Sequence, residues 1–207
     1  MGEHMLSSRF AAALVVSGAV LGLPACAGGA RSGTAGEGET ATLSDDQIAG
    51  VLHAVNRELM RQAMLGRQRS VSGWTRDYAE GLLETHAAAA EVLGGLLAKE
   101  RFEAAPSPLA DELVASLAQT WERLAEVELS SFDRAFLETE DRVHQRLLAL
   151  VDDRLLPSSQ RWGLTNYLRN LRVLYARQVR AARVTLYVSP LTPPQLSVPR
   201  VLDPFWP

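Results

Sequence analysis

Four side chains in the sequence have the types and spacing that could hold a metal ion: Glu58, His86, Glu140 and His144. Imidazole nitrogens together with carboxylate oxygens form a ligand set that suits zinc or iron. Glu140 and His144 are four residues apart, so both would project from the same face of a helix. Glu58 and His86 fall on or beside the apolar faces of two earlier helical segments. These four residues are therefore a candidate site for a single Zn or Fe ion.

A second interpretation of the same residues needs no metal. Both imidazoles could hydrogen-bond to Glu58, Glu140 or Gln178 in a buried network that fixes the register of a helical bundle. A di-metal centre of the ferritin type would need a Glu-x-x-His pair on each of two helices. Leu83 stands three residues before His86, so we do not expect ferroxidase or oxidase chemistry.

The sequence gives little support to other kinds of chemistry. Seven serines stand where helix caps belong: Ser70, Ser72, Ser107, Ser130, Ser131, Ser158 and Ser159. Gly94-Gly95 follows no strand that could present a phosphate-binding loop. Lys and Arg number 21 against 24 Asp and Glu, for a net charge of −3. Nucleic-acid-binding proteins usually carry a basic excess. We therefore expect a protein that is not an enzyme and that binds no nucleic acid.

The N-terminal segment has the features of a bacterial lipoprotein signal. Arg9 precedes an apolar run, residues 10–23, which is short for a membrane span but typical of a signal peptide. The run leads into LPAC, ending at Cys26, which resembles a lipobox whose cysteine receives a diacylglycerol and becomes the mature N-terminus. Ala27, rather than Asp, follows, which by the enterobacterial sorting rule implies the outer membrane, facing the periplasm. The alternative is an ordinary secretory signal in which Cys26 is incidental.

Helical periodicity then continues from Ser44 to about Val188. Short Ser-, Gly- and Pro-containing breaks divide it into helices expected at about 44–67, 73–102, 108–128, 132–155 and 160–187. Short connections imply antiparallel neighbours. The simplest packing is a helical hairpin, a crossover that contains the third helix, and a second hairpin. We therefore expect an all-α antiparallel four-helix bundle with an additional crossover helix.

These features divide the chain into four parts. Residues 1–25 are the expected lipoprotein signal peptide, 26–43 the lipidated cysteine with a Gly-rich tether, 44–188 the bundle and 189–207 a Pro-rich tail. The tail contains six of the ten prolines, and its last residues include Phe205 and Trp206. It could fold back along the bundle, or it could be an exposed docking peptide with these two aromatic residues as anchors.

The segments that carry the polar residues are similar to a known family. The similar residues are Ser44-Asp45-Asp46-Gln47-Ile48, Asn56-Arg57-Glu58, Tyr78-Ala79, His86, Phe132-Asp133 and His144. Over about 44–186 the chain resembles the bacterial family called domain of unknown function 4142, often labelled a predicted outer membrane or periplasmic protein. Two positions depart from its pattern: Thr85 replaces an acidic residue, and Gln178 stands where a histidine is frequent.

The resemblance implies a ferritin-like bundle carried behind a secretion signal. With the lipobox at Cys26, it favours a lipid-anchored envelope protein that binds an unknown protein or small molecule in the periplasm. The alternative function is metal binding by the inward-facing His and Glu side chains.

Overall fold

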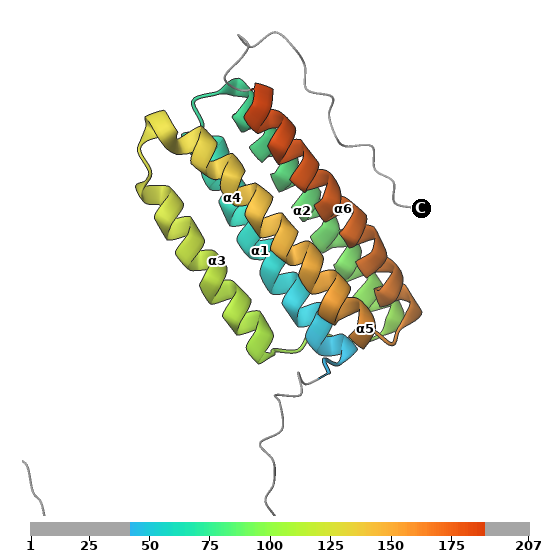
Figure 1. Cartoon of the computed structure of the whole chain (residues 1–207). Coiled ribbons are helices and arrows are strands. Elements are labelled where there is room, and N and C mark those ends of the chain that lie inside the picture. The colour runs from blue at the N-terminus through green and yellow to red at the C-terminus, as the bar shows by residue number, and fades with distance from the viewer. Residues whose placement is uncertain (1–41, 189–207) are drawn as a thin grey trace, which may run out of the picture. The chain divides into compact units, whose positions relative to one another are not determined.

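The computed structural model describes residues 42–188. The expected signal peptide, Cys26, most of the tether and the Pro-rich tail lie outside the described residues. The long helices are α1 (Asp45–Arg69), α2 (Gly73–Glu100), α3 (Pro108–Glu126), α4 (Leu129–Leu150) and α6 (Trp162–Val188), shown in Figure 1. A short π-helix, η1 (Val151–Leu155), and α5 (Leu156–Ser158) continue directly from α4. The expectation of an all-α fold is confirmed.

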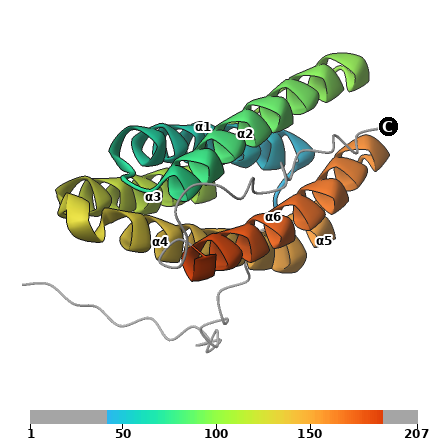
Figure 2. The same ribbon diagram turned by 90° about the horizontal axis from the view of Figure 1, so that it is seen from above.

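Helices α1, α2, α4 and α6 form the bundle. α1 packs along α2 and α4 packs along α6, while α2 also contacts α6 and α1 also contacts α4. Figure 2 shows the α1–α2 hairpin on one side and the α4–α6 hairpin on the other. α3 lies in the crossover between the hairpins and packs mainly against α1. The arrangement is the expected four-helix bundle with an additional helix.

The ends of the helices follow local sequence signals. Ser44 forms a capping box with Gln47: its hydroxyl accepts from Gln47 N (3.2 Å), and Gln47 Oε1 accepts from Ser44 N (3.1 Å). The Ser107 hydroxyl accepts from Ala110 N (3.2 Å), with Pro108 at the first position of α3. These two starts were expected from the sequence.

The fourth helix differs from its expected range of 132–155. It begins at Leu129 and runs through η1 and α5 to Ser158. η1 lies close to Pro157, which has no backbone N–H to donate within the helix. The carboxylate of Asp133 accepts from Val71 N (3.1 Å) and Ser72 N (2.7 Å), so α4 holds the turn between α1 and α2.

The core fills the space between the helices with Leu, Ile, Val and aromatic side chains. Close packing requires a glycine at Gly66 of α1, where a Cβ would overlap the ring of Phe136 on α4. Within residues 42–188, no helix is both long and apolar enough to span a membrane.

Candidate functional site

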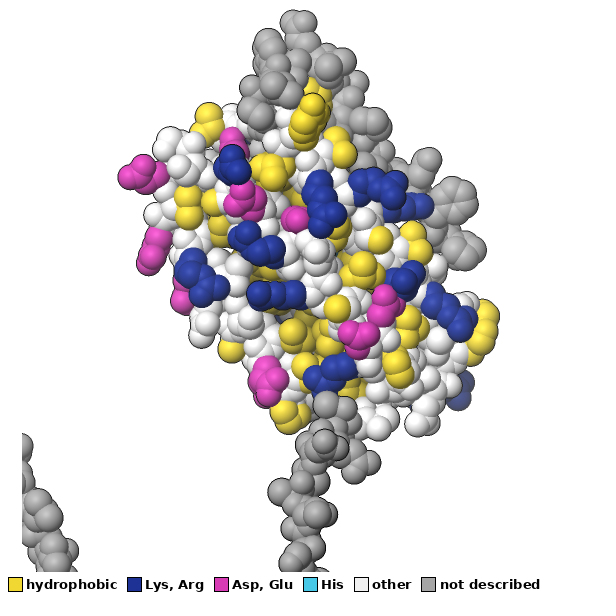
Figure 3. All heavy atoms as spheres, in the orientation of Figure 1, with side chains coloured by type: hydrophobic (Ala, Val, Ile, Leu, Met, Phe, Trp, Pro, Cys, Tyr) yellow, Lys and Arg dark blue, Asp and Glu magenta, His cyan; other side chains and the backbone are white. Residues whose placement is uncertain are grey.

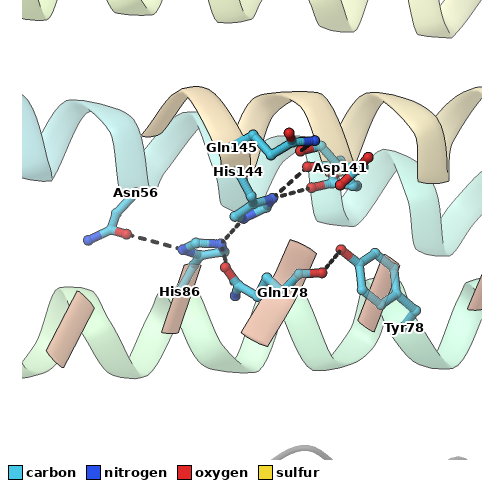
Figure 4. Close-up of polar contacts among 8 residues, drawn as sticks. Asn56, Tyr78, His86, Asp141, His144, Gln145 and Gln178 are labelled. Carbon is cyan, nitrogen blue, oxygen red and sulfur yellow. Dashed lines mark hydrogen bonds and ion pairs between the residues drawn. The ribbon is translucent and has the colours of Figure 1, made fainter. Parts of the chain in front are cut away.

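The interior of the bundle contains a group of polar side chains, one from each bundle helix. Asn56 comes from α1, His86 from α2, His144 from α4 and Gln178 from α6, and all four are buried. The two imidazoles have no exposed surface at all. Figure 4 shows His86 and His144 turned toward one another, with Asn56 on the far side of His86. Each side chain is here because it lies on the apolar face of its helix, which the bundle buries.

The partners of His86 fix the position of its proton. Its Nδ1 lies 3.2 Å from Asn56 Oδ1, an oxygen that can only accept. Burial raises the pKa of Tyr167 to about 12, an effect that a hydrogen bond from the Asn56 amide opposes. The Tyr167 hydroxyl in turn donates to Ala89 O (3.0 Å). Because Asn56 Oδ1 faces Nδ1 of His86, Nδ1 is assigned as the donor, which leaves a lone pair on Nε2.

His144 is oriented in the same way from its own helix. Its Nδ1 lies 2.9 Å from the backbone oxygen of Glu140 and 3.1 Å from Glu140 Oε2. A backbone carbonyl only accepts, so Nδ1 is again the protonated nitrogen. The Nε2 atoms of His144 and His86 are 3.4 Å apart, and Gln178 Nε2 lies 3.4 Å from His86 Nε2. The Nε2 atoms of the two rings therefore face one another in the core, and the Gln178 amide nitrogen lies within donating distance of that of His86.

Burial determines the electrostatics of this group. Desolvation, with the coulombic effect of His144, lowers the pKa of His86 well below its ordinary value, so His86 is neutral at pH 7. Burial raises the pKa of Glu140, an effect that its contact with His144 partly opposes. Within residues 42–188, neither carboxylate oxygen of Glu140 makes a well-aligned hydrogen bond. The site thus combines a neutral imidazole at His86 with a buried carboxyl group that contacts His144.

The structure brings together only part of the candidate metal set. His86 and His144 meet through their Nε2 atoms, and Glu140 lies at the opposite edge of the His144 ring. Glu58, although buried, pairs on its own helix with Arg61 (3.1 Å) and Arg57 (3.4 Å). In the described part of the chain, no three His, Cys, Asp or Glu side chains are grouped so that they could hold a metal ion. The histidine pair is therefore the centre of the site, and Glu58 does not belong to it.

Two residues of the site were not among the candidates from the sequence. Asn56 lies among Leu52, Val55 and Leu59 on the buried face of α1. A polar residue within an apolar stripe is unusual, so this position could have been identified from the sequence. Tyr175 of α6 has its ring centroid 5.6 Å from that of His144 and 6.4 Å from that of His86. Its ring therefore forms part of the apolar surroundings of the pair.

The family described as Domain of unknown function (DUF4142) matches residues 30–183. The chain belongs to this family. The match includes all four residues of the polar group, and the resemblance inferred from the sequence is confirmed. No curated protein and no solved structure matches the chain. The ferritin-like relationship implied by the resemblance therefore stays an expectation.

The surface of this DUF4142 domain, within the described residues, has hollows on either side of α3. The larger, about 440 Å³, lies between α1, α3 and residues 104–106, and Asn56 is among its lining residues. The smaller, about 300 Å³, lies between α3 and α4. Neither hollow is lined by His86 or His144. Asn56 is therefore the residue that connects the larger hollow with the histidine pair.

Two arginines of α6 pair with carboxylates of neighbouring segments. Arg172 pairs with Asp152 (2.6 Å), and Arg183 pairs with Asp141 (2.8 Å). Figure 3 shows basic and acidic side chains interspersed over the face turned to the viewer. This mixed surface agrees with the net charge of −3 and offers no continuous basic strip on that face.

Proposed function

We propose that this protein is a lipid-anchored, non-enzymatic binding protein of the cell envelope whose bundle binds one transition-metal ion between His86 and His144. The observation that carries the metal proposal is the distance of 3.4 Å between the two imidazole Nε2 atoms in the core.

The distance supports this proposal quantitatively. Two nitrogen ligands that each lie about 2.1 Å from an ion and subtend a tetrahedral angle are about 3.4 Å apart. The Nδ1 atoms support it as well, because a metal-binding histidine typically donates its other N–H to a carbonyl or carboxylate oxygen. Asn56 Oδ1 and the oxygens of Glu140 provide these acceptors. Both rings are thus oriented as metal ligands would be.

Binding is favoured over catalysis by the burial of the pair. Neither imidazole has any exposed surface, so a substrate would have no open access to a metal held there. The proposed location, anchored through Cys26 in the outer membrane and facing the periplasm, is supported by the apolar run 10–23 and the LPAC sequence. Two or more acyl chains would make such an anchor stable.

A second candidate is the binding of a periplasmic small molecule in the larger hollow. Its volume of about 440 Å³ falls in the range of small-molecule sites. His53, Arg57 and Asp111 line it and offer polar groups of both charges. Asn56 would connect a ligand in this hollow with His86.

The metal proposal is tested on the full chain, isolated from membranes in detergent without a chelator. We expect near-stoichiometric zinc, iron or copper by mass spectrometry, and its loss in a His86→Ala/His144→Ala double variant. His53→Ala is the matched control because His53 lies outside the pair, on the surface of α1, and it should retain the metal. If the double variant does not fold, His86→Gln/His144→Gln preserves more of the packing and replaces it.

The absence of bound metal would contradict the proposal. A folded wild-type chain that contains no metal, and whose unfolding temperature does not rise on addition of zinc, iron or copper, would leave the histidines with a structural role. A ligand that binds only the native state raises the free energy of unfolding by about 2.7 kcal/mol when present at 100 times its Kd. Metal binding of this strength would therefore raise the unfolding temperature measurably.

A further inference from the structure

The smaller hollow, between α3 and α4, is lined by three arginines that lack a counter-charge. Arg123 comes from α3, and Arg142 and Arg146 come from α4. In the described part of the chain, none of the three forms an ion pair. The acidic residue of the lining, Glu138, pairs with Arg134 at 2.8 Å, and Arg134 lies outside the lining. The hollow therefore has an excess of positive charge.

This excess of charge favours a bound anion. Arg142 and Arg146 stand four residues apart on one face of α4, a spacing at which like charges destabilise a helix. A hollow lined by charges of one sign also raises the local concentration of ions of the opposite sign. An anion bound there would neutralise the charge and remove the repulsion.

Threonine side chains hold two of the arginines in position. Arg123 Nη2 donates to Thr120 Oγ1 (3.2 Å), and Arg142 Nη2 donates to Thr139 Oγ1 (3.1 Å). Each threonine stands three residues before its arginine and lines the same hollow. A guanidinium group that is already held loses less conformational entropy when a ligand binds. Each group also keeps N–H donors for that ligand, since a guanidinium has five.

The Thr139 hydroxyl provides a further donor. Its side chain is buried, with 6% of its surface exposed. The hydroxyl of Thr120 donates to Ser116 O (2.9 Å), whereas no residue in the described part of the chain accepts from the hydroxyl of Thr139. The hollow thus presents guanidinium and hydroxyl donors, which suit a ligand rich in acceptor oxygens.

A phosphate monoester matches this lining in charge and in hydrogen bonding. Such a group carries a charge of about −2 at pH 7 and three oxygens that accept hydrogen bonds strongly. Three arginines against one carboxylate leave an excess of two positive charges in the lining. The planar fork of a guanidinium group fits phosphate oxygens in pairs. A carboxylate, with one charge and two oxygens, would neutralise less of the lining.

The rest of the lining is apolar and limits the size of the ligand. Leu124, Val127, Ala135 and Val143 line the hollow. Its volume of about 300 Å³ is at the lower end of the range for small-molecule sites. A small apolar group next to the phosphate would be stabilised by contact with these side chains.

From these observations we infer that the hollow between α3 and α4 binds a phosphate monoester that carries a small apolar substituent. Arg123, Arg142 and Thr139 donate to the phosphate oxygens, and Arg146 adds the third positive charge. Thr120 is a positioning residue that acts through Arg123. Soluble phosphate esters and the headgroup of phosphatidic acid both present this chemistry. The site is separate from the histidine pair, and the inference does not depend on bound metal.

The experiment is calorimetric titration of the full chain in detergent, in a phosphate-free buffer with a chelator. Butyl phosphate is the probe. Inorganic phosphate lacks the apolar group, and pentanoate replaces the phosphate with a carboxylate. We expect one butyl phosphate per chain, bound about tenfold more tightly than either comparison ligand.

Dihexanoyl phosphatidic acid distinguishes the two sources of the ligand. Tighter binding of this lipid than of butyl phosphate would identify a lipid headgroup, and weaker binding would identify a soluble ester. Dihexanoyl phosphatidylcholine, whose phosphate is a diester, should bind more weakly than either.

Arginine variants place the binding in the hollow. Arg123→Gln and Arg142→Gln each remove one charged donor, so each should lower the affinity for butyl phosphate about tenfold. Arg177→Gln is the matched control, because Arg177 is exposed on α6 and lies outside the lining. Figures 1 and 2 show α6 and α3 on different sides of α4. The control should leave the affinity unchanged, and circular dichroism establishes that each variant is folded.

The role of Thr120 is tested by a pair of substitutions. Thr120→Val removes the hydroxyl that holds Arg123 and should lower the affinity about threefold. Thr120→Ser keeps a hydroxyl and should restore the affinity. Equal affinities in Thr120→Val and the wild type would overturn the positioning role.

Three results would overturn the inference. The first is a folded wild-type chain that does not bind butyl phosphate. The second is a loss of affinity in Arg177→Gln as large as that in Arg123→Gln, which would place the binding outside the hollow. The third is pentanoate bound as tightly as butyl phosphate, which would contradict the assignment to phosphate. None of these results bears on the proposed metal site.

Discussion

The carboxylate of Glu140 lies 3.1 Å from Nδ1 of His144, at the edge of the ring opposite the nitrogen that meets His86. Glu140 therefore influences the histidine pair only through His144. A carboxylate behind a metal-binding imidazole orients the ring and raises its basicity. The relationship assigns Glu140 a positioning role rather than the ligand role considered from the sequence.

We expect Glu140→Gln to weaken metal binding without abolishing it. The amide preserves shape but removes the negative charge behind His144, so metal affinity should fall by about 10- to 100-fold. The metal-free variant should be at least as stable as the wild type, because burial raises the pKa of Glu140 and thus disfavours its ionised form. Chelator competition and denaturant unfolding measure the two effects. Unchanged metal affinity would argue against the positioning role.

The stability of the metal-free protein should depend on the proton of His86. Its pKa in the fold lies well below the ordinary value of 6.5, so below pH 6.5 the unfolded chain binds a proton that the folded chain does not. Stability should therefore be fully present above pH 6.5 and decline as the pH falls toward the folded pKa.

Urea unfolding between pH 4.5 and 8, in the presence of a chelator, measures this dependence. The titratable groups facing His86 include His144 directly and Glu140 through His144. A His86→Gln variant should show a smaller decline below pH 6.5 than the wild type. An identical decline in both proteins would assign the effect to other groups.

Gly66 permits the contact between α1 and α4, and its replacement should be costly. In Gly66→Ala the new Cβ would overlap the ring of Phe136, which is fully buried and cannot move away freely. Overpacking of this kind typically costs about 1–3 kcal/mol of unfolding free energy. Gly81→Ala is the matched control, because its Cβ would meet nothing within 4 Å. The control should stabilise α2 by about 0.5–1 kcal/mol, since alanine favours a helix. Equal effects of the two substitutions would contradict the close contact.

Cys26→Ala should release the protein from the membrane. If the cysteine carries the lipid, wild-type protein will fractionate with membranes and incorporate a fatty-acid label, and the variant will do neither. Helical content in the variant should equal that of the wild type, because Cys26 lies outside the helical domain at 45–188. A variant that stays membrane-bound would contradict lipid anchoring through this residue.

The helices could be predicted well because their signals are local. The Ser44 cap and the Pro108 start depend on neighbours a few residues away, and each expected helix lies close to its observed position. The expected range 132–155 included η1 but missed the start of α4 at Leu129 and the short α5, because a single turn leaves no clear periodic signal. The pattern also placed His86 and His144 on buried faces, since burial of a helical stripe follows from its own sequence.

The sequence by itself thus determined the helices, their apolar faces and the inward direction of both histidines. Only the tertiary structure decided which polar groups meet, because contacts between helices depend on their neighbours and their rotation. The 3.4 Å between the Nε2 atoms joins residues 58 positions apart, and His86 meets Asn56 across a different helix pair. Glu58 shows that a position near the buried face does not by itself place a residue in the site. Its stripe position made it a candidate, yet Arg61 on the same helix pairs with it at 3.1 Å, and no cross-helix partner is needed.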